Sequence, residues 1–361
     1  MISQENTGFC EPHIRLQFPE SRDGDITRCA TQETELEDED GCNGSAPAPA
    51  LNDRPIIGVL AQEQHYKFWD KYPENYTSYI AASYVKALEA SGARVVPIMI
   101  GKDRAYYKDI IGKLNGVLFP GGATYFNQSN GFADAGQHIY ESAIEINEAG
   151  DYFPIFGTCL GFELIIILAS GRGPVENRVH CHSFGNSPLN FTSDFRKSKM
   201  YKSAGEDIIN ILSREDITAN HHQFCIVDEN LKSHNLTKEW RVTAHSNDAN
   251  GLEFIASVEH NRYPFYGVQF HPEKIYEWKQ TKSYPHSYTA IKANRHFMDF
   301  FVNECRMNNH KFSDEEEENK CLIYNYNTHF TGAEGSEYLQ CYFFEPRNVG
   351  KGKENYSNVA I

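Results

Sequence analysis

The chain lacks any uninterrupted apolar segment long enough to cross a lipid bilayer, which excludes a membrane-spanning helix from its organisation. It also lacks a run of basic residues. Its 49 acidic residues outnumber its 34 lysines and arginines, which gives a formal net charge of −15. Nucleic acid is therefore excluded as a partner, since binding to phosphates needs clustered positive charge. The nine cysteines and 15 histidines show no recognisable zinc spacing, so we expect neither a metal nor another cofactor.

The first part of the chain is poor in apolar residues. Residues 1–53 are polar and acidic and end in a stretch rich in Gly, Ser, Ala and Pro. Such a composition cannot bury enough surface to fold alone, so we predict a disordered leader and linker there. We predict one domain over residues 54–345 and a flexible tail over 346–361. A hydrophobic content of 40% in 361 residues is sufficient for the core of one large α/β domain.

The most informative segment begins at Phe153 and reads Phe-Pro-Ile-Phe-Gly-Thr-Cys-Leu-Gly-Phe-Glu-Leu-Ile-Ile-Ile-Leu. A short apolar run enters a cysteine flanked by glycines and a helix-like run leaves it, which predicts a strand, a sharp turn and a helix. The amino terminus of that helix favours the thiolate of Cys159. The pattern is typical of a nucleophile elbow with sulfur as the nucleophile. The alternative is a buried cysteine at an ordinary strand-to-helix junction.

A candidate base for this thiol lies in the segment Tyr-Gly-Val-Gln-Phe-His-Pro-Glu-Lys, which begins at Tyr266. Residues 266–270 predict a buried strand that ends at His271, because the proline that follows stops strand pairing. Open α/β sheets present catalytic groups beyond the carboxyl ends of their strands. We therefore predict that His271 exchanges a proton with Cys159 and that Glu273 orients its imidazole. The alternative is a structural histidine that bonds a backbone carbonyl.

A third segment, Gly-Val-Leu-Phe-Pro-Gly-Gly-Ala from residue 116, predicts a strand that runs into a Pro-Gly-Gly loop. The main chain of such a loop can come close to a substrate, so Gly121 is a candidate substrate-binding residue. The N–H groups of Gly122 and Leu160 are candidate donors of an oxyanion hole. The same tripeptide also occurs in ordinary turns. It therefore indicates a functional site only in combination with the other two segments.

The order of the predicted elements indicates the fold class. Strands are expected at 56–60, 94–100, 117–119, 254–258 and 266–270, and helices at 79–91, 106–114, 137–149 and 290–304. Strands that alternate with helices predict an α/β fold, with a mostly parallel sheet covered by helices on both faces. The more polar segment 171–260 is expected to depart from this alternation and to form one side of the site cleft. The chain then re-enters the sheet with the strand that ends at His271.

These segments together resemble the class I glutamine-amidotransferase-type hydrolases, and specifically the gamma-glutamyl hydrolase family. The resemblance covers roughly residues 54–344 and also includes Pro-Ile-Ile-Gly-Val-Leu at 55, Tyr-Ile-Ala-Ala-Ser-Tyr-Val at 79 and Gly-Ala-Arg-Val-Val-Pro at 92. True amidotransferases usually carry Gln where Glu163 stands, so Glu163 favours the hydrolase branch. The resemblance implies a flavodoxin-like three-layer architecture.

The resemblance also implies an activity, the hydrolysis of gamma-glutamyl bonds in folate polyglutamates, with Cys159 as nucleophile and His271 as proton donor. It matches His222 to a histidine that handles substrate, although His221 stands next to it, and a solvated loop pair is the alternative for both. It further suggests a homodimer. A small-molecule substrate this anionic needs a locally basic site, for which Lys274 is a candidate. Arg94 is another, and a solvated surface position is the alternative for each.

Two other functions are consistent with the same motifs. One is a glutaminase-type amidotransferase domain that supplies ammonia to a partner, although the chain contains no recognisable synthase domain. The other is a non-enzymatic binding protein on the same fold, which the joint presence of Cys159, His271 and Glu273 disfavours.

The signals for a cellular compartment conflict. The resemblance implies a lysosomal, vacuolar or extracellular location, and Asn-x-Ser/Thr sites suit a glycosylated protein. These lie at Asn43, Asn75, Asn127, Asn190, Asn235 and Asn355. Residues 1–50 nevertheless lack the basic and apolar regions of a signal peptide. An atypical start or a cytosolic isoform would explain this, and we expect the secretory route.

The cysteine count does not settle the compartment. Its odd number suits a free Cys159, and candidate disulfide pairs are Cys10 with Cys29 and Cys321 with Cys341. Spacing alone gives no connectivity.

Overall fold

The computed structural model describes residues 51–64, 76–279 and 283–346. The leader predicted for residues 1–53 and the tail predicted for 346–361 lie almost wholly outside these ranges. Among the described residues, no helix combines the length and the hydrophobicity that crossing a membrane requires.

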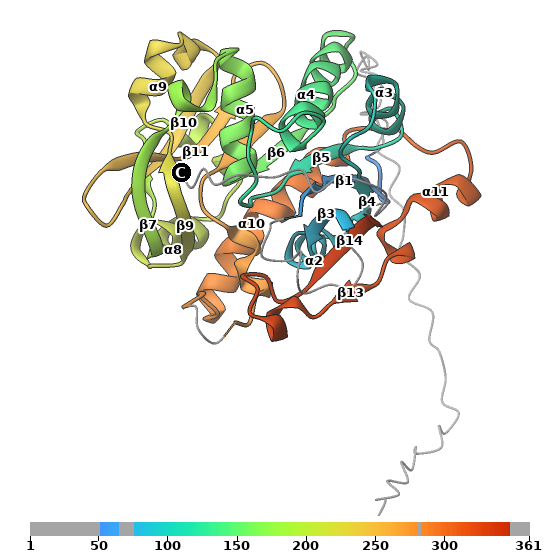
Figure 1. Ribbon diagram of the computed structural model, residues 1–361. Helices are drawn as coiled ribbons and strands as arrows, with labels where there is room; N and C mark the ends of the chain where they lie inside the picture. The colour runs from blue at the N-terminus through green and yellow to red at the C-terminus, as the bar shows by residue number, and fades with distance from the viewer. Residues whose placement is uncertain (1–50, 65–75, 280–282, 347–361) are drawn as a thin grey trace, which may run out of the picture. The chain divides into compact units, whose positions relative to one another are not determined.

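An eight-stranded sheet forms the centre of the domain (Figure 1). In spatial order its strands are β4 (Arg94–Ile98), β1 (Ile56–Leu60), β5 (Gly116–Phe119), β6 (Ile155–Thr158), β12 (Phe265–Val268), β11 (Glu253–His260), β10 (Trp240–Asn247) and β8 (Asn190–Phe191). The first five pair in parallel, and the last three continue the sheet in antiparallel fashion. The predicted α/β fold with a mostly parallel sheet is confirmed, and its parallel part has the flavodoxin-like order 2-1-3-4-5.

Helices cover both faces of this sheet, as the alternation of elements predicts. One face carries α2 (Ala82–Ala90) and α10 (Tyr288–Cys305), and the other carries α3 (Arg104–Ile111), α4 (Phe132–Glu148) and α5 (Leu160–Ser170). Successive side chains of a strand point to opposite faces. In β1, accordingly, Ile57 packs in the core on the α2 side and Ile56 in the core on the α3 side. Continuous apolar runs in the sequence thus mark strands covered on both faces.

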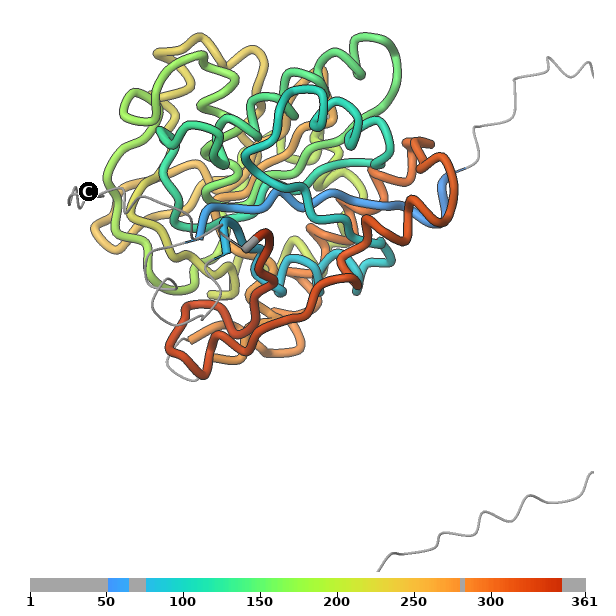
Figure 2. The backbone as a smooth tube through the Cα atoms, turned by 45° about the vertical axis from the view of Figure 1, so that its right-hand side comes forward, coloured from blue at the N-terminus to red at the C-terminus, as the bar shows by residue number. Residues whose placement is uncertain are grey.

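Residues 79–91, predicted as one helix, are divided between a strand and a helix. β3 covers Tyr76–Ala81, and α2 begins only at Ala82. β3 pairs with β14 (Cys341–Pro346) in a second, antiparallel sheet with β2 (Gln62–Glu63) and β13 (Thr328–His329). Figure 2 shows this return of the red C-terminal segment toward the blue and cyan N-terminal strands. The prediction was wrong for residues 79–81 because strand pairing with the far end of the chain overrides the local helical pattern.

Residues 171–260 leave the alternation of strands and helices, as predicted. They form α6 (Pro174–Asn177), β7 (Val179–Ser187), η1 (Phe195–Lys197), α7 (Lys199–Lys202), α8 (Glu206–Arg214), β9 (Thr218–Cys225), α9 (Asp228–Ser233) and η2 (Leu236–Lys238), besides β8, β10 and β11. β7 and β9 pair as an antiparallel ribbon. The N–H of His271 donates to the carbonyl of Ala219 on β9, at 2.8 Å. The ribbon therefore lies against the segment that carries the candidate base.

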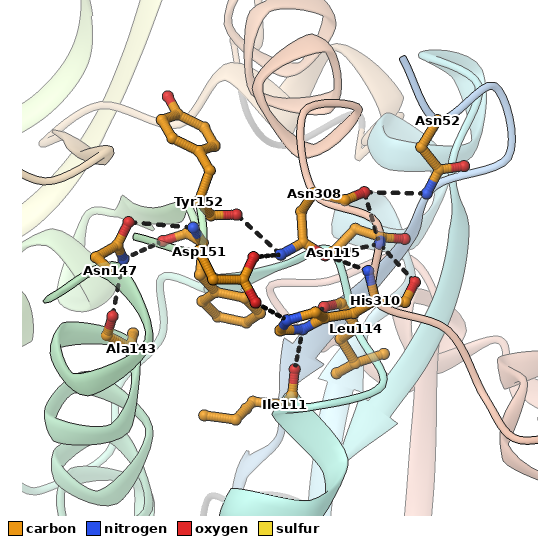
Figure 3. A network of polar contacts seen from close by, with 11 residues as sticks. Asn52, Ile111, Leu114, Asn115, Ala143, Asn147, Asp151, Tyr152, Asn308 and His310 are labelled. Atoms are coloured by element: carbon orange, nitrogen blue, oxygen red, sulfur yellow. Dashed lines mark hydrogen bonds and ion pairs between the residues drawn. The ribbon is translucent and has the colours of Figure 1, made fainter. Parts of the chain in front are cut away.

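A buried polar network lies at the amino-terminal ends of the parallel strands, opposite the end that carries the candidate site (Figure 3). Asn115 is 1% exposed; it accepts a hydrogen bond from the N–H of Ile56 and donates to the carbonyls of Asn308 and His310. Asn308 in turn donates to the carbonyl of Tyr152, at 2.8 Å. These side chains satisfy main-chain groups near the beginnings of β1 and β6, which fixes the end of the sheet remote from the candidate site.

The chain after the main sheet is mostly short elements. They are η3 (Pro272–Tyr276), α11 (Glu315–Cys321), η4 (Ile323–Asn325) and η5 (Thr331–Glu334).

Candidate active site

Cys159 occupies the sharp turn between β6 and α5. Its φ of 50° and ψ of −109° are unusual for a residue other than glycine. Its N–H donates to the carbonyl of Val268 on the neighbouring β12, at 2.7 Å. Gly161 permits this turn, because a Cβ at that position would lie 2.0 Å from the carbonyl oxygen of Phe119. The backbone geometry of a nucleophile elbow is therefore present at the predicted residue.

Parallel pairing of β6 with β12 brings His271 to the same edge of the sheet as Cys159. Thr158 pairs with Val268 in this register, so the residues that follow the two strands emerge side by side. Both candidate side chains flank Gly121. A Cβ at that glycine would lie 2.6 Å from Cε1 of His271 and 3.0 Å from Cβ of Cys159. The structure thus brings together the three segments that the sequence predicts to form the site.

Glu273 lies in position to orient His271. One carboxylate oxygen lies 2.8 Å from Nδ1 of the imidazole, and both side chains are buried. Because a carboxylate accepts and does not donate, Nδ1 is a ring nitrogen that carries a proton in this contact. Burial alone would raise the pKa of Glu273, but the charge and hydrogen bond of His271 outweigh burial and lower that pKa. Glu273 is therefore an ionised partner of the imidazole at neutral pH.

Burial and nearby carboxylates dominate the acidity of the Cys159 thiol. It is 4% exposed, and this burial raises its pKa well above the usual value, with further increases from the carboxylates of Glu163 and Glu273. The N–H of Leu160 and the ammonium of Lys274 act in the opposite direction but do not offset burial. The helix amino terminus therefore favours the thiolate as predicted, through the N–H of Leu160, but burial and the two carboxylates outweigh it, so a base must remove the proton.

Glu163, Gln269 and Arg178 form a connected polar group beside the nucleophile. No sequence motif links these three residues. Glu163 is 2% exposed; it accepts a hydrogen bond from Gln269 at 3.0 Å and forms an ion pair with Arg178 at 2.7 Å. The same amide nitrogen of Gln269 lies 3.9 Å from Sγ of Cys159. The guanidinium of Arg178 lies 4.4 Å from the ring centroid of Phe224, which adds a cation–π contact. Burial raises the pKa of Glu163, and the charge and hydrogen bond of Arg178 oppose this rise while holding the carboxyl group close to the nucleophile.

A tyrosine hydroxyl joins the glycine loop to the candidate base. The N–H of Gly121 donates to the hydroxyl of Tyr84 at 2.8 Å, and this hydroxyl lies 3.4 Å from Nδ1 of His271. Tyr84 occurs in a motif that supports the family resemblance, yet its sequence gives no sign of a role in the site. Its position becomes informative only when α2 is placed against the loop.

The two predicted oxyanion donors lie in different surroundings. The N–H of Leu160 hydrogen-bonds the sulfur of Cys159 and so favours its anionic form. Gly122 packs closely on Gln62, because a Cβ at that glycine would lie 1.7 Å from the Oε1 of Gln62. The Nε2 of Gln62 donates to the carbonyl of Pro120 at 3.1 Å, which holds the loop in place. The oxyanion role of both N–H groups stays a prediction.

His222 lies on β9 and is buried, which contradicts a solvated loop position for it. Its Nε2 lies 3.0 Å from Oδ1 of Asn220. Burial, together with the charge of His271, lowers the pKa of His222 to about 3, so its imidazole is neutral at physiological pH. The neighbouring His221 packs against the ring of Tyr284, with centroids 5.3 Å apart. His222 therefore lies within electrostatic reach of the candidate base, although its contact with substrate stays a prediction.

The observed disulfide joins Cys181 to Cys225 and not a pair named from the sequence. Cys321 and Cys341 are both free, so that expected pair was wrong; it failed because sequence spacing does not report which strands are neighbours. Cys10 and Cys29 lie outside the described residues. Cys159 is free, as expected.

The two candidate basic residues lie in different surroundings. Arg94 begins β4 at the amino edge of the sheet and pairs with Glu318, so it lies away from the candidate site. Lys274 is 3% exposed, which contradicts a solvated position. Its Nζ lies 4.5 Å from the ring centroid of Tyr338 and 5.2 Å from that of Tyr284. Lys274 is thus the one of the two that contributes positive charge beside the catalytic candidates.

Comparison with known proteins gives a consistent picture. The model of the family Peptidase C26 matches residues 55–273. The gamma-glutamyl hydrolase of Homo sapiens is 38% identical over 295 residues, covering 81% of this chain and 90% of that protein. Gamma-glutamyl hydrolase B of Dictyostelium discoideum is 38% identical over 296 residues, covering 81% and 84%. Gamma-glutamyl hydrolase 1 of Arabidopsis thaliana is 30% identical over 336 residues, covering 90% and 94%.

Proposed function

The chain belongs to the peptidase C26 family, and on that premise we propose that it is a gamma-glutamyl hydrolase acting on folate polyglutamates through Cys159 and His271. One observation carries this proposal: the two side chains flank Gly121 at the carboxyl edge of the parallel strands. A nucleophile and a base so placed suit acyl transfer, in which a thiol attacks an amide carbonyl.

The proposed reaction begins with the transfer of the Cys159 proton to Nε2 of His271. The sulfur forms a bond to the gamma-carbonyl carbon, and the N–H groups of Gly122 and Leu160 stabilise the resulting oxyanion. The C–N bond then breaks, His271 returns the proton to the departing amine, and a thioester remains. Water attacks the thioester, giving up a proton to His271, which passes it to the departing sulfur. Glu273 stabilises the imidazolium that forms twice in this cycle.

The raised pKa of the Cys159 thiol supports coupling proton transfer to the arrival of substrate. A buried thiol is unreactive toward solvent, and the imidazole beside it accepts the proton as the carbon–sulfur bond forms. We further propose that His222 contacts the substrate. Because its imidazole is neutral at physiological pH, it would do so as an uncharged ring and not as a cation.

Replacement of the nucleophile tests the proposal. Cys159→Ala is expected to abolish release of glutamate from a defined pteroyl-pentaglutamate, measured by mass spectrometry, while circular dichroism and the unfolding midpoint stay near those of the unchanged protein. Undiminished hydrolysis by this variant would reject the mechanism. A parallel assay of glutamine hydrolysis separates the proposed activity from an ammonia-supplying glutaminase, which would prefer glutamine to the folate substrate.

We also propose that the protein enters the secretory route and forms a homodimer. The three described glycosylation motifs support the first part, because Asn127, Asn190 and Asn235 are all exposed. The disulfide between Cys181 and Cys225 suits an oxidising compartment. Removal of N-linked glycans from protein expressed in eukaryotic cells would lower its apparent mass if this is correct, and light scattering would give the oligomeric state.

A further inference from the structure

A group of side chains that could bind a metal ion is buried in the ribbon formed by β7 and β9. Cys181 lies on β7, and His222 and Cys225 lie on β9. All three are buried, and one ligand atom from each lies within 4.8 Å of the others. No metal is expected from the sequence, because the two cysteines lie 44 positions apart and only the pairing of β7 with β9 brings them together.

The contacts of Asn220 determine which nitrogen of His222 faces the sulfurs. Its amide nitrogen donates to the carbonyl of Thr218 at 2.9 Å, and a carbonyl can only accept. The amide oxygen of Asn220 therefore faces Nε2 of His222 at 3.0 Å, so Nε2 carries the proton. The lone pair of Nδ1 is then directed at Cys181 and Cys225, whose Sγ atoms each lie 3.4 Å away. Metal-binding histidines commonly have this arrangement, with the remote nitrogen bonded to an acceptor.

The carbonyl oxygen of Phe224 supports the same conclusion. It lies 3.1 Å from Nδ1 of His222, so both ring nitrogens face an acceptor. A neutral imidazole has one proton and cannot satisfy both contacts. Without a proton on Nδ1, its lone pair faces the carbonyl oxygen of Phe224, which is unfavourable. A cation bound between these two atoms would attract both of them.

We propose that Cys181, His222 and Cys225 form a zinc site when their disulfide is reduced. Tetrahedral zinc with bonds of about 2.0 Å to nitrogen and 2.3 Å to sulfur requires about 3.5 Å between these ligand atoms. In the disulfide both nitrogen–sulfur distances are 3.4 Å, and reduction frees the two sulfurs, which are bonded to each other, to move apart around an ion that stays within reach of Nδ1. Two thiolates neutralise a divalent cation, which suits a buried position. The carbonyl of Phe224 or a water completes the coordination.

Metal binding and the disulfide exclude each other. Two molecules of a low-molecular-weight thiol supply two electrons and two protons and leave joined as their own disulfide, so the Cys181–Cys225 bond becomes two thiols. Both thiols lose their protons when zinc binds. Reoxidation of the sulfurs removes two ligands and releases the ion, so the site is available only to the reduced chain.

Cobalt binding tests the site without reference to hydrolysis. The experiment uses the full chain with Cys159→Ala, which removes a further buried thiol that lies close to a histidine. After reduction with a phosphine and under anaerobic conditions, this protein is expected to bind one Co²⁺ more than its oxidised form. Thiolate-to-cobalt charge-transfer absorption should report the binding, and Zn²⁺ should displace the cobalt. Adding Cys181→Ser should remove this band, whereas adding Cys305→Ser, a matched change at a buried free cysteine, should preserve it.

Equal cobalt binding by the reduced, oxidised and Cys181→Ser proteins would overturn the proposal. A second measurement covers the event that Cys181→Ser fails to fold. In the reduced Cys159→Ala protein, Zn²⁺ is expected to protect Cys181 and Cys225 from alkylation, read by peptide mass spectrometry, and to leave Cys321 unprotected. Alkylation of the pair at the same rate with and without zinc would contradict the site. Neither result depends on whether the protein cleaves folate polyglutamates.

Discussion

Nδ1 of His271 lies 2.8 Å from the carboxylate of Glu273, two residues further along the chain at the beginning of η3. The candidate base and the group that orients it therefore belong to one short turn, and their contact does not depend on long-range packing. Only the approach of Cys159 from β6 requires the sheet. His271 and Glu273 form a local pair, whereas Cys159 follows a neighbouring strand. Mutations can therefore separate the contribution of the pair from that of the nucleophile.

Glu273→Gln is expected to lower kcat/KM by roughly 10² to 10⁴-fold, because an amide neither fixes the tautomer of His271 nor stabilises its charged form. The matched control is Glu277→Gln, a second carboxyl as deeply buried, at 1% exposure, just after the same turn. Glu277 accepts its hydrogen bond from the N–H of Leu339 instead. Steady-state kinetics on pteroyl-polyglutamate compare the two variants. Equal losses would show that burial of a carboxyl, and not contact with His271, matters.

Glu163→Gln should make the thiol of Cys159 more acidic. The carboxylate of Glu163 raises the pKa of Cys159, and its removal also leaves Arg178 as an unbalanced positive charge nearby. A lower thiol pKa means more thiolate at neutral pH, so iodoacetamide should react severalfold faster at pH 7 than with the unchanged protein. The rate–pH profile should shift toward acid. Glu176→Gln, at an exposed position, is the control and should leave the profile unchanged. A profile displaced toward alkaline pH would contradict this electrostatic assignment.

The parts predicted from sequence are those whose pattern is local. The apolar runs of β1, β5 and β6 and the glycines around Cys159 are consecutive residues, and they located both the parallel sheet and the elbow. The resemblance to a family added His222. Long-range pairing was out of reach: nothing near residue 79 shows that β14 will join β3, and nothing near Cys181 identifies Cys225 as its partner.

Electrostatic surroundings were equally inaccessible. The sequence indicates a helix amino terminus beside Cys159, which favours a thiolate, but gives no measure of burial or of the carboxylates that oppose it. Lys274 illustrates the same limit, because a lysine after His-Pro-Glu reads as a surface residue. Its burial follows from Tyr338, which the C-terminal segment places over the ammonium. Charge and burial at a site therefore depend on elements that are distant in sequence.

Asn115→Ala should destabilise the domain without affecting the chemistry. The side chain of Asn115 bonds the N–H of Ile56 and the carbonyl of His310, and its loss leaves these buried groups without those partners. A buried unsatisfied group typically costs about 1–3 kcal/mol, so the free energy of unfolding should fall by roughly that amount or more. Denaturant unfolding measures the change, with the exposed Asn319→Ala as control. Unchanged stability would show that water replaces the lost contacts.

Gly161→Ala tests whether the elbow tolerates any side chain beside the nucleophile. A Cβ at Gly161 would lie 2.0 Å from the carbonyl oxygen of Phe119, and backbone on both sides leaves no flexible group to yield. The clash must therefore displace α5 or β5, and with them the sulfur of Cys159 and the adjoining glycine loop. We expect kcat/KM to fall at least 10²-fold, since a displacement of about 1 Å suffices for such a loss, together with a lower unfolding midpoint. Gly173→Ala is the matched control, because its Cβ would meet nothing within 4 Å, and it should change neither quantity. If Gly161→Ala retained full activity, the close approach of α5 to β5 would not be what positions the nucleophile.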